Sequence, residues 1–110
     1  CSKLQSLYCD NCSLESLDLS ECPLITSVSC RSNKITSLNT NGCDLLKSLY
    51  CEWNKLITLD VSTNLKLTDL NCSNMETLKV LYVSADQSIN GITHDRRSSY
   101  IPDTTEIIVK

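Results

Sequence analysis

LKSLYCEWNKLITLDVSTN, residues 46–64, is the stretch that decides the fold. Related segments begin at Leu4, Ile25 and Leu67, so the pattern returns every 21 residues, from 4 to 25, 25 to 46 and 46 to 67. Apolar residues keep this register in the columns Leu4/Ile25/Leu46/Leu67, Leu7/Val28/Leu49/Leu70, Leu14/Ile35/Leu56 and Leu17/Leu38/Leu59, with a weaker column at Leu19/Thr40/Val61. A period of this length predicts a solenoid in which each repeat forms one turn.

The eight cysteines follow the same register. One column contains Cys9, Cys30, Cys51 and Cys72, and a second contains Cys1, Cys22 and Cys43 and continues with Asn64. Cys12 stands in a third column, whose later members are Asn33 and Asn54. The Cys9-x-x-Cys12 spacing is therefore a consequence of two columns that meet in one turn.

Each repeat predicts two short extended segments. The L-x-C segment alternates with a period of two, which favours a strand whose apolar side faces inward, and successive turns should align these strands in a parallel sheet. A second segment, at residues 16–19, 37–40 and 58–61, is expected to return along the opposite wall. Asn33 and Asn54 follow the first strand, where their amides can bond backbone groups left unpaired at the bend.

The repeat covers residues 1–83 as about four turns, and residues 84–110 lose the period. A solenoid end exposes apolar columns and needs a cap. We therefore interpret residues 84–110 as a C-terminal cap with one strand near residues 105–109. Cys1 already occupies a repeat column, so we expect further repeats upstream of it.

The last turn is one residue out of register. Thr77 stands where an apolar residue is expected, and Leu78 follows it. Residues 78–83 can lie on the returning wall after a one-residue insertion, or they can close the first sheet after a deletion. We favour the insertion, because a turn needs about 21 residues to come around.

Composition argues against several function classes. A net charge of −3 gives no basic field for nucleic acid, and no apolar run approaches the roughly 18 residues of a membrane span. A zinc site needs four ligands, whereas Cys9 and Cys12 have no second pair and the only histidine, His94, lies in the tail. With no base beside a cysteine, we expect no catalytic residue, no metal and no cofactor.

Disulfides are the closer alternative for the cysteines. Neighbours in one column would lie about 4.8 Å apart along a parallel sheet, which is within reach of a bridge. Side chains in register point the same way, however, and this disfavours the bridge geometry. We expect buried free thiols that pack as small apolar groups.

The pattern LxxLxCxxNxLxxLDVSxN resembles the leucine-rich repeats of 21 residues, and residues 46–64 match it best. It is similar to the cysteine-containing internalin-type repeats of bacterial surface proteins and to repeats in secreted proteins of Bacteroidetes-type bacteria. The resemblance covers residues 1–83 and implies a curved, right-handed, mainly β rod at the cell surface. It also implies a protein or glycan partner and no catalysis. Cys12, Cys22 and Cys43 depart from the asparagines that are typical of the pattern.

The predicted binding surface is the concave face of the first sheet. Its candidate residues are Tyr8, Tyr50, Trp53, Arg31, Glu52 and Asn71, because exposed aromatic residues on a regular sheet are used by protein and carbohydrate partners. The alternative for the tyrosines is that they merely cover the strands. For the chain as a whole, we expect a monomeric binding module, or alternatively a structural spacer without a ligand of its own.

Overall fold

The computed structural model describes residues 2–87, 89 and 105–110, so Cys1, His94 and most of the predicted cap lie outside the described part. Within it every regular element is a β-strand, and stacked coils with a period near 21 residues form a β-solenoid of about four turns. None of the described residues belongs to a helix that could span a membrane. The described strands are β1 (Ser6–Tyr8), β2 (Ser16–Asp18), β3 (Ser27–Ser29), β4 (Ser37–Asn39), β5 (Ser48–Tyr50), β6 (Thr58–Asp60), β7 (Asp69–Asn71), β8 (Val80–Val83) and β9 (Glu106–Val109).

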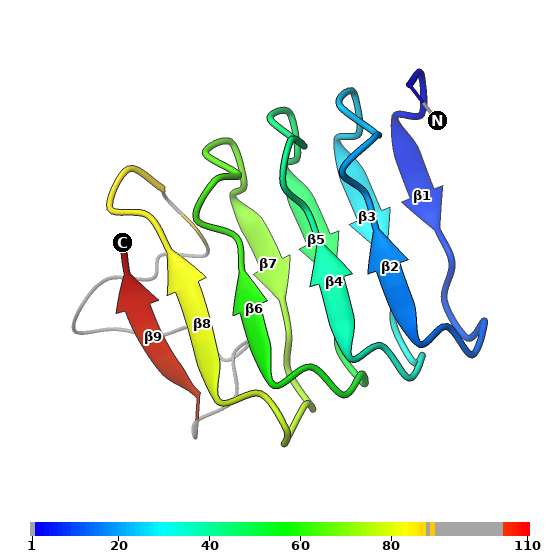
Figure 1. Cartoon of the computed structure of the whole chain (residues 1–110), viewed down its shortest axis with the longest axis vertical. Coiled ribbons are helices and arrows are strands. Elements are labelled where there is room, and N and C mark those ends of the chain that lie inside the picture. Colours follow the sequence, from blue (N-terminus) through cyan, green and yellow to red (C-terminus); the bar gives the residue numbers. More distant parts are fainter. Residues whose placement is uncertain (1, 88, 90–104) are drawn as a thin grey trace.

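Strands β1, β3, β5 and β7 form one parallel sheet, which we call the first sheet (Figure 1). These are the L-x-C segments, so the predicted parallel sheet is confirmed. Leu7 pairs with Val28, Val28 with Leu49, and Leu49 with Leu70, and each step spans 21 residues. Because the pairing repeats the sequence period, every strand presents the same side to the core.

The returning segments form the opposite wall (Figure 1), in which β2 pairs with β4 and β6 pairs with β8. Leu17 lies opposite Leu38, again 21 residues apart, whereas Leu59 lies opposite Leu81, 22 residues apart. The last turn therefore carries one extra residue and places β8 on the returning wall. The favoured interpretation of residues 78–83 is confirmed, and the alternative position in the first sheet is wrong.

Strand β9 lies beside β8 in parallel, with Leu81 opposite Ile107. The predicted strand near residues 105–109 is thus present, and it extends the returning wall. Lys110 holds this end in place, because its Nζ lies 2.8 Å from Asp60 Oδ2 and 4.5 Å from the centre of the Tyr82 ring. These contacts connect the end of β9 with both β6 and β8.

The core consists of the apolar columns of the repeat. Leu46, Leu49, Leu67 and Leu70 have no exposed surface, and the equivalent residues of the first turn are partly buried. Each buried leucine contributes about 2 kcal/mol, so a few aligned columns stabilise the solenoid. Thr40, in the weak column, is also buried, and its hydroxyl donates to Asn64 Oδ1 at 2.7 Å.

Buried asparagine side chains join consecutive turns. Asn54 Nδ2 donates to the carbonyl of Cys51 in its own turn at 2.9 Å and to that of Cys30 in the preceding turn at 2.8 Å. Its Oδ1 accepts from the backbone N–H of Ile35 at 3.1 Å. Asn33 bonds Cys9 and Cys30 in the same way. The prediction that these amides pair the backbone at the bend is confirmed.

A second set of amides joins the turns at the other bend. Asn64 is fully buried, and its Nδ2 donates to the carbonyls of Thr40 at 2.9 Å and Cys43 at 3.1 Å. One turn later Gln87 Nε2 donates to the carbonyls of Val61 and Asn64 at 2.6 and 2.8 Å. Among the described residues no buried side-chain nitrogen or oxygen lacks a partner.

The outward column Asp18, Asn39 and Asp60 on the returning wall forms local turns. The side-chain oxygen of each accepts from the backbone N–H two residues later, at 2.9, 3.0 and 2.9 Å. This bond lowers the pKa of the Asp18 carboxyl, because it stabilises the ionised form. This outward column therefore bonds the backbone that follows each returning strand.

The described cysteines are free thiols in graded environments. Cys22, Cys30, Cys43, Cys51 and Cys72 are buried, Cys9 is half-buried and Cys12 is exposed. Burial raises the pKa of the Cys30 thiol from 9.0 to about 12, because the thiolate would lose its hydration, and it also raises the pKa of Cys51. The Cys30 and Cys51 thiols therefore stay protonated at neutral pH.

The change Asn54→Ala should lower the free energy of unfolding by about 2 kcal/mol or more, because it leaves the Ile35 N–H and the Cys51 carbonyl without their partner and each buried unpaired group costs about 1–3 kcal/mol. Urea unfolding followed by circular dichroism measures this. Lys55→Ala, at the exposed neighbouring position, serves as the control and should stay within about 0.5 kcal/mol of the wild type. Equal midpoints for the two variants would contradict the role of Asn54.

The free energy of unfolding should fall as the pH rises above 9. The folded pKa of Cys30 lies above its ordinary value, so its contribution is complete below pH 9 and is lost toward pH 12. The expected slope is up to about 1.4 kcal/mol per pH unit for each such thiol. Urea unfolding at several pH values measures it. Cys30→Ala should show a shallower slope and Cys12→Ser an unchanged one, and identical slopes for all three proteins would refute the assignment.

Candidate binding surface

The predicted binding residues lie on or beside the face of the first sheet that points away from the core. Alternate residues of a strand point to opposite faces. Leucine or valine points inward at the centre of each strand, and the outward residues are Ser6, Tyr8, Ser27, Ser29, Ser48, Tyr50, Asp69 and Asn71. We call this surface the outer face, and it includes the next outward row, which is Asp10, Arg31, Glu52 and Ser73.

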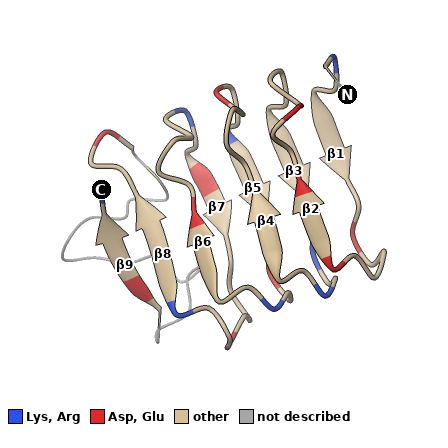
Figure 2. Ribbon diagram, viewed as in Figure 1, with Lys and Arg blue, Asp and Glu red and all other residues tan. Residues whose placement is uncertain are grey.

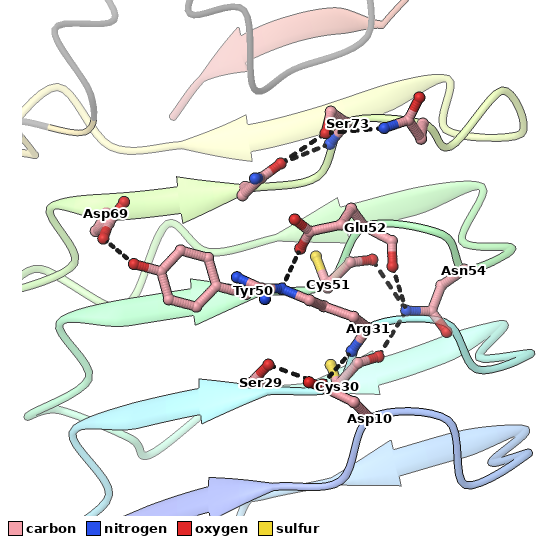
Figure 3. A network of polar contacts seen from close by, with 12 residues as sticks. Asp10, Ser29, Cys30, Arg31, Tyr50, Cys51, Glu52, Asn54, Asp69 and Ser73 are labelled. Atoms are coloured by element: carbon pink, nitrogen blue, oxygen red, sulfur yellow. Dashed lines mark hydrogen bonds and ion pairs between the residues drawn. The ribbon is translucent and has the colours of Figure 1, made fainter.

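Polar contacts run across the outer face from strand to strand (Figure 3). Asp10 Oδ1 accepts from the Ser29 hydroxyl at 2.7 Å and from the backbone N–H of Arg31 at 2.8 Å. Arg31 Nε donates to Glu52 Oε1 at 3.2 Å. The Arg31 guanidinium also lies 4.7 Å from the centre of the Tyr50 ring. These contacts hold Arg31 in one orientation above the sheet.

Tyr50 is enclosed by its neighbours on the outer face. Its hydroxyl donates to Asp69 Oδ2 on the next strand, and Arg31 covers its ring from the preceding strand (Figure 3). The bond to Asp69 raises the pKa of the Tyr50 phenol, because ionisation would break it. Tyr50 is half-buried rather than fully exposed, which matches the alternative interpretation that a tyrosine in this column covers the strands.

Tyr8 occupies the same column as Tyr50, but 72 % of it is exposed. It lies on β1, which is at the edge of the first sheet and pairs with β3 alone among the described strands. No described strand precedes β1 that could supply a side chain to cover Tyr8 as Arg31 covers Tyr50. The exposure of Tyr8 thus follows from its edge position.

Trp53 belongs to a middle turn of the solenoid, with a neighbouring turn on each side, and is nevertheless exposed. It is 58 % exposed and follows β5 with a φ of 63°. The equivalent residues Asn11, Ser32 and Asn74 have φ values of 57°, 56° and 54°, so this bend is left-handed in every turn. Asparagine tolerates this conformation, whereas for a bulky residue it costs roughly 1–2 kcal/mol. Tryptophan is therefore unfavourable at this position for folding alone.

The two remaining predicted residues have smaller exposed surfaces. Glu52 is only 8 % exposed, and its carboxylate is used by Arg31. Asn71 is half-buried, and its Oδ1 accepts from the backbone N–H and the hydroxyl of Ser73 at 3.1 and 2.8 Å. The structure thus separates the six predicted residues into Trp53 and Tyr8, which are open, and four that belong to the contact network.

Sequence reasoning did not identify Asp10 and Asp69 as members of this network. Their contacts with the hydroxyls of Ser29 and Tyr50 are diagonal, between residues 19 apart, and therefore do not follow the column register. Ile57, Leu24 and Leu65 are also exposed apolar residues that it did not single out. Within residues 2–87, 89 and 105–110, no three histidine, cysteine, aspartate or glutamate residues are grouped so that they could hold a metal ion.

Comparison with known proteins adds no relative to this description. No family model, curated protein or solved structure matches the chain. The resemblance to leucine-rich repeats therefore rests on the repeat pattern itself.

The change Trp53→Asn should raise the free energy of unfolding by roughly 1 kcal/mol, because asparagine tolerates the left-handed conformation that tryptophan resists. This corresponds to an increase of about 3–6 °C in the melting temperature of a domain of this size. Differential scanning calorimetry measures the change. Ile57→Asn is the matched control, since Ile57 is 62 % exposed and is not among the residues with positive φ. If both substitutions changed the melting temperature equally, the strain at Trp53 would be disproved.

Proposed function

We propose that this protein is a non-catalytic binding module that recognises a macromolecule through the outer face of the first sheet and the adjoining bend. The observation that carries this proposal is Trp53, a large aromatic residue that is exposed and backbone-strained. Strained residues of this kind are concentrated at functional sites. Exposed tryptophan is also among the residues that contribute most to binding energy.

The surroundings of Trp53 support this proposal. Its neighbours in the same column, Ser32 and Asn74, are small and polar, so the indole ring lies between side chains that do not cover it. Beside it, Arg31 and Glu52 form an oriented pair on the outer face. A rigid surface with one open aromatic ring and fixed polar groups loses little conformational entropy on binding.

The family and the compartment belong to the same proposal. The leucine columns, the cysteine column and the 21-residue period support membership of the bacterial leucine-rich-repeat proteins with internalin-type repeats. Such repeats suggest a protein that is secreted or displayed at the cell surface. Free thiols buried in the cysteine column, such as that of Cys30, would stay reduced outside the cell, because burial keeps them protonated and poorly reactive.

The second candidate function is a structural spacer that separates other domains and binds nothing. The enclosure of Tyr50 favours it, since that residue serves the sheet instead of a partner. This candidate gives no reason for a strained and exposed tryptophan. A spacer would be at least as stable with asparagine at position 53.

The two candidates differ in what Trp53→Asn does to binding. Wild-type protein and the variant, coupled to beads at equal density, should be exposed to the same culture medium and cell-wall extract. Retained protein and sugar are then measured by mass spectrometry and by acid hydrolysis with sugar analysis. The binding module predicts a component that the wild type retains at least about tenfold better than the variant. Equal retention by both, with both folded, would support the spacer.

A further inference from the structure

We infer that the ligand of the outer face is an uncharged, hydroxyl-rich chain, which means a neutral polysaccharide. This inference rests on the proposed binding function and specifies the chemistry of its ligand. Three observations support it: the outer face has no free positive charge, Arg31 is held with hydrogen-bond donors to spare, and an open aromatic ring, that of Trp53, lies in the adjoining bend.

The outer face offers no free positive charge. β1, β3 and β5 contain no charged residue, and β7 contains only Asp69 (Figure 2). Asp69 accepts the Tyr50 hydroxyl, Asp10 accepts from Ser29 and Arg31, and Glu52 neutralises Arg31. The exposed Lys47 precedes β5 and so lies at the opposite end of the strand from Trp53. An anionic ligand would find no free positive charge on this face, and a cation would meet the Asp10 and Asp69 carboxylates, which already accept hydrogen bonds from within the protein.

The Arg31–Glu52 pair can still donate hydrogen bonds. Arg31 Nε is used by Glu52, and within the described part of the chain its two Nη groups have no hydrogen-bond partner. The Arg31 side chain is 43 % exposed, while that of Glu52 is 11 % exposed. A guanidinium presents its N–H groups as a planar fork. Because Glu52 balances its charge, this fork suits neighbouring hydroxyls of a sugar better than an anion.

Trp53, in the bend that adjoins the outer face, supplies an exposed apolar surface. It directly follows Glu52, whose carbonyl accepts from the backbone N–H of Ser32 at 3.1 Å. A pyranose ring has one face of C–H groups and a rim of hydroxyls. The face can stack on the indole while the rim bonds Arg31 and the small polar neighbours of Trp53. A protein partner would more often require an apolar interface core, which this serine-rich face lacks.

The arrangement suits a polymer better than a single sugar. Tyr8, the second open aromatic ring, lies two strands away from Tyr50, which is about 10 Å across the sheet. Ser27 and Ser48 add hydroxyl groups in the neighbouring outward column, on the side of Tyr8 and Tyr50 that is away from Trp53. A chain of several sugar units could therefore contact both Trp53 and Tyr8.

The test uses the full chain and soluble hexasaccharides of β-1,4-linked glucose, mannose, xylose and N-acetylglucosamine, with hexagalacturonate as the charged counterpart. Isothermal titration calorimetry should show binding to at least one neutral hexasaccharide and weaker binding to hexagalacturonate. The affinity for the neutral sugar should change less than about twofold between about 0.05 and about 0.5 M NaCl, because salt screens only charge interactions. Trp53→Asn should weaken it at least about tenfold.

The variant Glu52→Gln tests the role of its charge, because loss of a purely structural contact would not change the preference between neutral and charged hexasaccharides. It keeps the size of the side chain but leaves the charge of Arg31 unbalanced, so the preference should shift toward hexagalacturonate by about tenfold or more. Glu21→Gln removes one exposed negative charge elsewhere and should leave the preference unchanged. Thermal melting confirms that each variant is folded. If Glu52→Gln proved unstable, the double change Arg31→Gln and Glu52→Gln should still weaken neutral-sugar binding without creating a preference for hexagalacturonate.

The outcomes separate this inference from the proposed function. If no neutral hexasaccharide binds the folded wild type, or if Glu52→Gln and Glu21→Gln bind alike, the inference is overturned. If the beads then retain a protein through Trp53, the binding function stands and only the ligand class is wrong. If Trp53→Asn equals the wild type in every assay, both fail.

Discussion

The pairing of backbone groups between consecutive turns is the constraint on which the whole structure depends. A turn of about 21 residues with strands of three or four residues cannot bury its apolar side or pair its own backbone at the bends. The backbone at the bends is paired by Asn33, Asn54, Asn64 and Gln87, because each reaches from its own turn to a carbonyl of the turn before. The apolar side of each turn is buried by the aligned leucine and cysteine columns. Regular stacking is thus imposed at the same points in every turn.

This regularity also shapes the surface. Since every turn repeats the same geometry, outward side chains lie in rows about 4.8 Å apart and can bond across strands. The contacts of Asp10, Arg31, Glu52 and Asp69 use this spacing, and they leave the outer face without a free positive charge. A surface whose polar groups bond one another is rigid and offers an anion little electrostatic attraction. Under the proposed function, recognition by this surface depends on shape, hydroxyl bonding and aromatic contact.

Trp53 is the point at which folding and the proposed recognition make different demands. The left-handed bend recurs in four successive turns and is compatible with asparagine or serine. Tryptophan at this bend makes the turn less favourable while it exposes an indole ring to solvent. Among the described residues the other exposed aromatic one is Tyr8, which requires no such explanation because it lies on an edge strand. The sequence predicts both as exposed aromatic binding residues, but only Trp53 has a backbone conformation that is unfavourable for its side chain.

The sequence by itself determined the solenoid, the strands of both walls, the role of Asn33 and Asn54 and the one-residue slip before β8. All of these follow from a 21-residue register, and a register is visible in a sequence because each column repeats its residue type. Tertiary structure alone decided which candidate residues are open. The contacts that enclose Tyr50 and bury Glu52 join residues 19 or 21 apart on different strands, with different partners in each turn. Such contacts depend on side-chain length and direction, which the column pattern does not specify.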